Sequence, residues 1–266
     1  MYEQVPFWKG KKGMKKLSVL LVLTILLCGC SAKENFSDKM KIGYATDLSK
    51  EDGADSVERQ GDHQDSTYFK HPDFYNLKSS KSLSIISNFK TMQQTSEWSC
   101  GVASALMTLE HFDKLGNYNE KSLAEFRTNK LEPGATSLES MIKIFEGIGG
   151  FKINSTYDYE SDEYDQISLE MIQDYLKKDI PVMVAWNDWG GHWQVIIGYD
   201  TMGTETTQDD VIIVADPYDT TDHNQDGYGI YPAERFFYNW TMYDFFEANY
   251  DLPERDKLFI AVEPIK

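Results

Sequence analysis

Apolar side chains recur at helical spacing near the middle of the chain. Val102, Leu106 and Leu109 follow one another at intervals of three or four positions, which predicts a helix that runs from Cys100 to about Phe112. Just upstream, the short apolar run at residues 83–86 predicts a strand.

Two more helices are predicted further along the chain. Thr136 is expected to be the N-cap of the first, with Glu139 completing a capping box, and Gly149 ends this helix. The second helix is expected to begin at Ser168. Their buried faces are predicted to be formed by Leu138, Met141, Phe145 and Ile148 in the first helix and by Met171, Ile172, Tyr175 and Leu176 in the second.

Apolar runs predict strands in the second half of the chain. They cover residues 182–185, 189–200, 211–217 and 258–262. A turn centred near Thr204 would join the middle two runs as a hairpin and place His192 directly opposite Asp216, with about 5 Å between their Cβ atoms. A β-bulge in either strand would shift this register by one residue.

The first 30 residues have the pattern of a targeting segment. A cluster of lysines precedes an apolar run at residues 17–27, which is short for a membrane span and is typical of a signal peptide. The run ends in Cys28-Gly29-Cys30, which resembles the lipobox of bacterial lipoproteins and implies that Cys30 carries lipid. An ordinary secretory signal with two incidental cysteines is the alternative.

The chain is therefore predicted to have three parts. Residues 1–29 form a lipoprotein signal peptide, with Met14 as a possible true start, and residues 30–81 form a polar, mostly disordered tether. The aromatic residues near the end of this tether are candidates to dock on the domain formed by residues 82–266; they are Tyr68, Phe69, Phe74 and Tyr75. The expected location is the outer face of the bacterial cytoplasmic membrane, reached through the lipid anchor.

Charge limits the partners that the exported part can have. The chain holds 43 acidic and 26 basic residues, and residues 1–30 contain five of the lysines and one glutamate. The remainder therefore has a net charge near −21. Such a surface repels nucleic acid and anionic lipid and attracts basic peptides or divalent cations.

Removal of the leader and lipidation of Cys30 leave Cys100 as the one unmodified cysteine. A thiol at a helix N-terminus meets unpaired backbone N–H groups and the positive end of the helix dipole, which favour the thiolate. Gln94 lies six positions earlier and offers an amide donor for an oxyanion. A buried structural cysteine is the alternative interpretation.

Three stretches of the sequence resemble the bacteriocin-processing-like peptidases of the papain-like clan. They are residues 94–107, 191–199 and 215–218, and the resemblance spans about residues 82–262. It implies an α+β papain-like cysteine peptidase fold, in which an N-terminal helical part carries the nucleophile and packs on an antiparallel sheet that carries the histidine and the aspartate.

Carried over residue by residue, the resemblance also implies roles. Cys100 would be the nucleophile, His192 the base, Asp216 the residue that orients the base, and Gln94 the oxyanion-hole donor. Gln93 competes for the last role but is one position too far from the cysteine. Relatives that cut double-glycine leaders are usually fused to transporter bundles with an ATPase, whose phosphate-binding motif is absent from this sequence, so we expect a stand-alone exported relative.

An acidic turn follows the predicted strands. Asp222, Asn224 and Asp226 with the next Gly match the opening half of a calcium loop, in which Tyr228 would supply a backbone ligand. The closing Glu is absent, because Ala233 occupies its position, and a solvated surface turn is the alternative.

The predicted function is hydrolysis of peptide bonds in a peptide or protein substrate, with no required cofactor and with calcium as a possible structural ion. Two alternatives stay open. One is an acyl transferase or amidase that uses the same triad, and the other is a non-catalytic calcium-binding surface lipoprotein.

Overall fold

A computed structural model describes residues 38–42, 48–49, 52–54, 66–70, 72–160, 162–188, 190–220, 224–241 and 256–266. All of these belong to one compact unit of the chain, residues 36–266. The predicted leader, Cys30 and Asp222 lie outside the described residues. None of the helices in the described ranges has the length and apolar character needed to cross a membrane.

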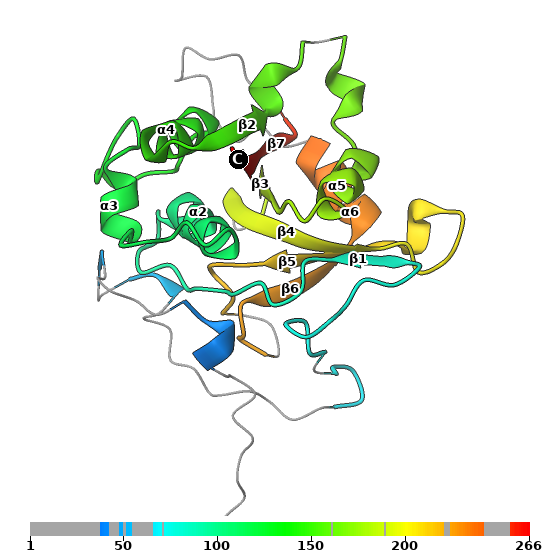
Figure 1. Cartoon of the computed structure of the whole chain (residues 1–266). Helices are drawn as coiled ribbons and strands as arrows, with labels where there is room; N and C mark the ends of the chain where they lie inside the picture. Colours follow the sequence, from blue (N-terminus) through cyan, green and yellow to red (C-terminus); the bar gives the residue numbers. More distant parts are fainter. Residues whose placement is uncertain are drawn as a thin grey trace, which may run out of the picture. The chain divides into compact units, whose positions relative to one another are not determined.

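The described residues form a seven-stranded sheet in which neighbouring strands pair antiparallel (Figure 1). Six strands follow one another in the order β2-β7-β3-β4-β5-β6, and β1 pairs with β4 beside this path. The strands are β1 (Leu83–Ile85), β2 (Phe151–Ser155), β3 (Val182–Trp186), β4 (His192–Asp200), β5 (Val211–Ala215), β6 (Tyr228–Pro232) and β7 (Leu258–Pro264).

Helices pack against this sheet. They are α2 (Cys100–His111), α3 (Glu120–Ala124), α4 (Leu138–Ile148), α5 (Leu169–Leu176) and α6 (Ala233–Thr241), with short 3₁₀ turns at η1 (Asp38–Met40), η3 (Thr156–Asp158), η4 (Tyr164–Gln166) and η5 (Thr207–Asp209). Helix α2 packs against β4, α4 against β2 and β7, α5 against β4, and α6 against β6 and β3 (Figure 1). The predicted α+β fold is confirmed.

Strand β4 is the centre of the domain and is buried over nearly its whole length. Successive side chains of a strand face opposite sides. On one side, the indole N–H of Trp193 donates to the carbonyl of Thr136, just before α4. On the other side, Trp186 of the neighbouring strand packs against Phe236 of α6. Both sides of β4 are therefore covered, which explains why it carries apolar residues on both sides.

The predicted hairpin register was wrong by two residues. Val195 pairs with Ala215 rather than with Ile213, and a β-bulge between Ile196 and Gly198 then shifts the pairing by one further residue. On the His192 side of the bulge, the shift of two residues keeps the side chains on their predicted side of the sheet, because side chains alternate with a period of two. His192 and Asp216 thus become diagonal neighbours on one side instead of directly opposed residues, still within reach of each other.

Helix α4 begins one residue later than predicted. Ser137 is the N-cap, and its hydroxyl accepts a hydrogen bond from the backbone N–H of Ser140 at 3.1 Å. The predicted cap at Thr136 was wrong because the first helical hydrogen bond runs from the backbone N–H of Met141 to the carbonyl of Ser137 at 3.0 Å, whereas the carbonyl of Thr136 accepts from the indole of Trp193. Glu139 forms an ion pair with Lys143 instead of completing a capping box.

Segments upstream of the predicted domain boundary pack on the domain. Met40, Ile42, Ala54 and Phe74 are buried, and Lys41 forms a parallel β-bridge with Thr91. Of the aromatic residues expected to dock, Phe74 is buried and Tyr75 is partly buried against the core, whereas Tyr68 and Phe69 are exposed. The boundary at residue 82 and the lipid anchor stay predictions.

Candidate active site

Cys100 is the first residue of α2, as predicted, and its side chain is buried. Burial raises the pKa of this thiol, but the hydrogen bond and the charge of His192 lower it, together with the backbone N–H groups of Trp193 and Gly101. The lowering effects dominate, so the pKa of Cys100 lies below the ordinary value. The helix N-terminus favours the same ionised state.

His192 begins β4 and joins the thiol to a carboxylate. Its Nε2–H donates to Oδ1 of Asp216 at 2.7 Å, which leaves Nδ1 as the ring nitrogen for the hydrogen bond with Cys100. Burial lowers the pKa of His192, yet the charge and hydrogen bond of Asp216, followed by those of Cys100, raise it to about 10. The imidazole is therefore held as an imidazolium at neutral pH.

Asp216 follows β5, and its two oxygens are fully engaged. Oδ1 accepts from His192 and from the backbone N–H of Tyr218, and Oδ2 accepts from the side-chain amide of Gln194 at 2.7 Å. Burial raises the pKa of Asp216, but the charge and hydrogen bond of His192 outweigh it and hold the pKa below its usual range. The carboxylate is thus fixed in both orientation and charge.

The role of Gln194 was not predicted from the sequence. Extending the observed register by one residue places it opposite Asp216. Its Oε1 accepts from the indole N–H of Trp186 at 2.7 Å, which orients the amide so that Nε2 can donate to Asp216. An uncharged polar residue within a fully buried apolar strand was the signal that could have identified it.

Gln94 lies in the loop before α2 and is 1% exposed. Its backbone N–H donates to the carbonyl of Pro217 at 2.9 Å, next to Asp216 in the chain. Its side-chain Nε2 donates one hydrogen to the carbonyl of Ser96 at 2.8 Å, and an amide nitrogen carries a second hydrogen. The competitor Gln93 instead directs its amide to the carbonyl of Asp219 at 3.5 Å.

A buried carboxylate holds the loop that joins Gln94 to Cys100. Glu120 is 1% exposed, and it accepts hydrogen bonds from the backbone N–H of Thr95 at 3.0 Å, the hydroxyl of Thr95 at 2.6 Å and the hydroxyl of Ser99 at 2.8 Å. A carboxylate this well satisfied can be buried without a large penalty. No local pattern connects Glu120 with the cysteine, because Glu120 follows a polar loop.

Tyr218 connects the two sides of the site. Its ring lies edge-on to the imidazole of His192, with 6.4 Å between ring centroids, and its hydroxyl donates to Oε1 of Glu97 at 2.7 Å. Burial, with the hydrogen bond to Glu97, raises the pKa of Tyr218 to about 12. This residue therefore joins the loop after β5 to the loop before α2.

The acidic turn proposed for calcium is only partly described. Asn224 and Asp226 are buried, and Oδ1 of Asp226 accepts from the backbone N–H of Tyr228 at 3.0 Å. The Tyr228 hydroxyl donates to the carbonyl of Phe89, and β6 begins at this residue. Within the described ranges, no group of three or more His, Cys, Asp or Glu side chains is arranged to hold a metal ion, and Asp222 lies outside them. Calcium binding stays a prediction.

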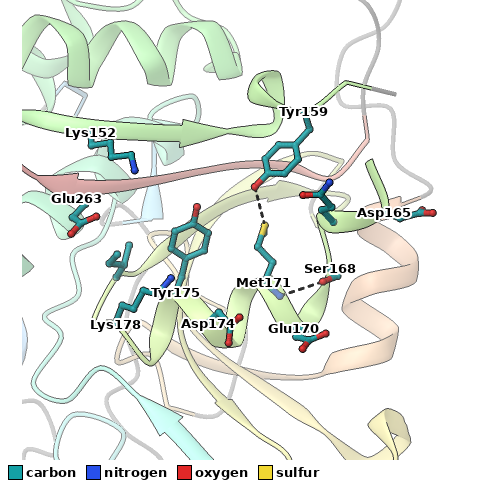
Figure 2. Close-up of a pocket in the computed structure, with 12 residues that line it drawn as sticks. Lys152, Tyr159, Asp165, Ser168, Glu170, Met171, Asp174, Tyr175, Lys178 and Glu263 are labelled. Carbon is teal, nitrogen blue, oxygen red and sulfur yellow. Dashed lines mark hydrogen bonds between the residues drawn. The ribbon is translucent and has the colours of Figure 1, made fainter. Parts of the chain in front are cut away.

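A polar cavity of about 510 Å³ lies between β2 and α5 (Figure 2). Its lining includes Lys152, Tyr159 and Tyr175, and the Tyr159 hydroxyl is directed to the sulfur of Met171. None of the four predicted site residues lines it.

The arrangement corresponds to one class of protein. An antiparallel sheet that brings a histidine and an aspartate to a cysteine at the start of a buried helix is the organisation of papain-like cysteine peptidases. The model of the family described as Peptidase_C39 like family matches residues 86–246, which is more than half of the chain. The chain belongs to this family, as its resemblance predicted. No match is found among curated proteins.

Proposed function

We propose that this protein is an exported, lipid-anchored cysteine peptidase that cleaves peptide bonds with Cys100, His192, Asp216 and Gln94. The family supports cysteine peptidase activity. The observation that carries the assignment of residues is the buried chain of contacts from Cys100 through His192 to Asp216. Export and anchoring rest on the signal peptide and lipobox of the sequence.

Each group has a step in the proposed reaction. The Cys100 thiolate attacks the carbonyl carbon of the scissile bond, and the oxyanion that forms accepts hydrogen bonds from the second Nε2 hydrogen of Gln94 and the backbone N–H of Cys100. The His192 imidazolium then transfers its Nδ1 proton to the leaving amine, and the C–N bond breaks to leave a thioester.

Hydrolysis of the thioester regenerates the enzyme. His192, now neutral, takes a proton from water, the resulting hydroxide attacks the thioester carbonyl, and the carboxylic product leaves Cys100 as thiolate. Asp216 remains ionised throughout and stabilises the imidazolium whenever it forms.

The ionisation states predict the pH dependence. Activity falls as acid protonates the thiolate, whose pKa lies below the ordinary thiol value because of His192. Activity also falls in alkali, as the pH rises through about 10 and His192 loses the proton that the leaving amine needs. The apparent pKa values of this pH profile belong to Cys100 and His192 as a coupled pair, and neither value can be assigned to one of the two groups alone.

The test is a comparison of the wild type with Cys100→Ser and His192→Ala on a mixture of peptides, with products read by mass spectrometry. We expect cleavage by the wild type and a loss of about 10³-fold or more in each variant. Cleavage that persists in Cys100→Ser would contradict the proposal. An added amine nucleophile separates hydrolysis from acyl transfer, because a transferase would release the acyl group mainly as the amide.

A further inference from the structure

Part of the segment that was expected to be a tether, residues 30–81, lies directly on the loop that carries Gln94. We call this segment the N-terminal extension. We call residues 48–49 and 52–54 the N-terminal strap. Its backbone N–H groups make three hydrogen bonds to this loop: Leu48 to the hydroxyl of Thr95 at 2.9 Å, Gly53 to Oε1 of Glu97 at 3.0 Å, and Ala54 to the carbonyl of Gln94 at 3.0 Å. The strap therefore forms hydrogen bonds with three of the four residues from 94 to 97.

Gly53 is the closest point of contact between the strap and the loop. It has a φ of +92°, a conformation that side chains other than that of glycine rarely adopt. A Cβ atom at this position would lie 2.5 Å from the carbonyl carbon of Thr95 and 2.6 Å from the nitrogen of Ser96. These atoms belong to the backbone and cannot rotate away, so any larger residue must separate the strap from the loop.

The contact matters because it completes the support of Gln94. The backbone N–H of Gln94 is held by Pro217 at 2.9 Å, and its carbonyl is held by Ala54. Residue 94 is 1% exposed and Ala54 is fully buried, so a displaced strap would leave a buried carbonyl without its donor. The peptide plane of Gln94 would then shift, and its side-chain amide with it.

The strap also acts together with Glu120. The Thr95 hydroxyl accepts from Leu48 on the strap side and donates to Oε2 of Glu120 on the inner side. The loop is thus held between a buried carboxylate and the N-terminal extension.

We propose that Gly53 is a positioning residue of the peptidase: by allowing the strap to pack on the Thr95–Ser96 peptide, it keeps the Gln94 amide in place for the oxyanion. The N-terminal extension would then support the catalytic site in addition to tethering the domain. This inference rests on the proposed function.

The experiment is a kinetic comparison of full-length wild type, Gly53→Ala and Gly203→Ala. Gly203 is the matched control, because its φ is +76° and nothing lies within 4 Å of an added Cβ atom. We expect Gly53→Ala to lower kcat about 10- to 100-fold with KM little changed, because misplacement of one oxyanion donor acts on the transition state. Gly203→Ala should keep the wild-type kcat.

Alkylation of Cys100 by iodoacetamide separates positioning from general damage. This reaction displaces iodide at a methylene carbon and forms no oxyanion, so its rate and pH profile should be the same in Gly53→Ala and wild type. A variant that merely unfolds the site would lose both reactions.

Thr95→Val is the second variant, for the case in which Gly53→Ala does not fold. It keeps the shape of the side chain and removes the hydroxyl that joins the strap to Glu120. We expect the same loss of kcat with alkylation retained. An active wild type whose Gly53→Ala and Thr95→Val variants match Gly203→Ala, or exceed it, overturns this inference alone. A wild type that cleaves no peptide overturns the proposed function and this inference together.

Discussion

The substitution Asp216→Asn tests how the thiolate of Cys100 is maintained. Asparagine has nearly the same shape as aspartate and still offers an oxygen to His192, so the change removes mainly the negative charge. Two unit charges about 4 Å apart at an effective dielectric constant of about 20 interact by about 4 kcal/mol. This energy corresponds to about three pH units in the titration of His192.

The magnitude agrees with the structure, in which the pKa of His192 is raised to about 10 with Asp216 as the main cause of the increase. Without that charge, burial opposes the imidazolium and only the weaker effect of Cys100 still favours it, so the pKa of His192 should fall to about 6.5 or lower. The pair would then rest as neutral thiol and neutral imidazole at pH 7.

The assay is the rate of iodoacetamide alkylation at Cys100 as a function of pH, followed in the peptide that contains this residue. In the wild type the rate should rise well below the range of an ordinary thiol, and in Asp216→Asn it should rise near or above about 8.5. Asp210→Asn is the control, because Asp210 is equally buried but lies at the other end of β5, where it accepts from Tyr199. Superimposable profiles for wild type and Asp216→Asn would refute the reasoning.

Three further predictions concern packing, support of the site and calcium. Gly101→Ala should lower the free energy of unfolding, measured in urea, by about 1–3 kcal/mol, because the added Cβ atom would lie 2.8 Å from Cβ of Thr136 where α2 meets the start of α4. An unchanged urea midpoint would show that the packing between α2 and α4 accommodates the methyl group. Gln194→Leu leaves Oδ2 of Asp216 and the indole of Trp186 without their partners and should cost about 1–3 kcal/mol while lowering kcat; wild-type kinetics would show that Asp216 needs no such support. Millimolar calcium should raise the Tm of the wild type but not of Asp226→Asn, as the acidic turn predicts, and equal melting curves with calcium and with a chelator would remove the calcium site.

The sequence contained enough information to bring the principal residues together. Helical periodicity placed Cys100 at a helix start, and the alternation of β4 and β5 placed His192 and Asp216 on one side of the sheet. Next to His192 the register was wrong by two residues, because neither the exact centre of the hairpin loop nor the β-bulge can be read from local patterns, yet an even error leaves these side chains on the same side.

The supporting contacts could not be predicted from local patterns. Glu120 meets the loop before α2 only after α3 has packed, and the contact between Gly53 and Thr95 joins residues that are more than forty positions apart in a polar segment. Such contacts depend on tertiary packing, which periodicity and capping signals do not encode.

The most direct test of the central claim is covalent labelling with a peptide that carries an electrophilic vinyl sulfone, with intact-mass and peptide-level mass spectrometry at neutral pH. The proposed chemistry predicts one adduct, located at Cys100, formed rapidly in the wild type and strongly slowed in His192→Ala. Absence of the adduct in folded wild type, or equal labelling in His192→Ala, would contradict the assignment of Cys100 and His192 as a catalytic pair.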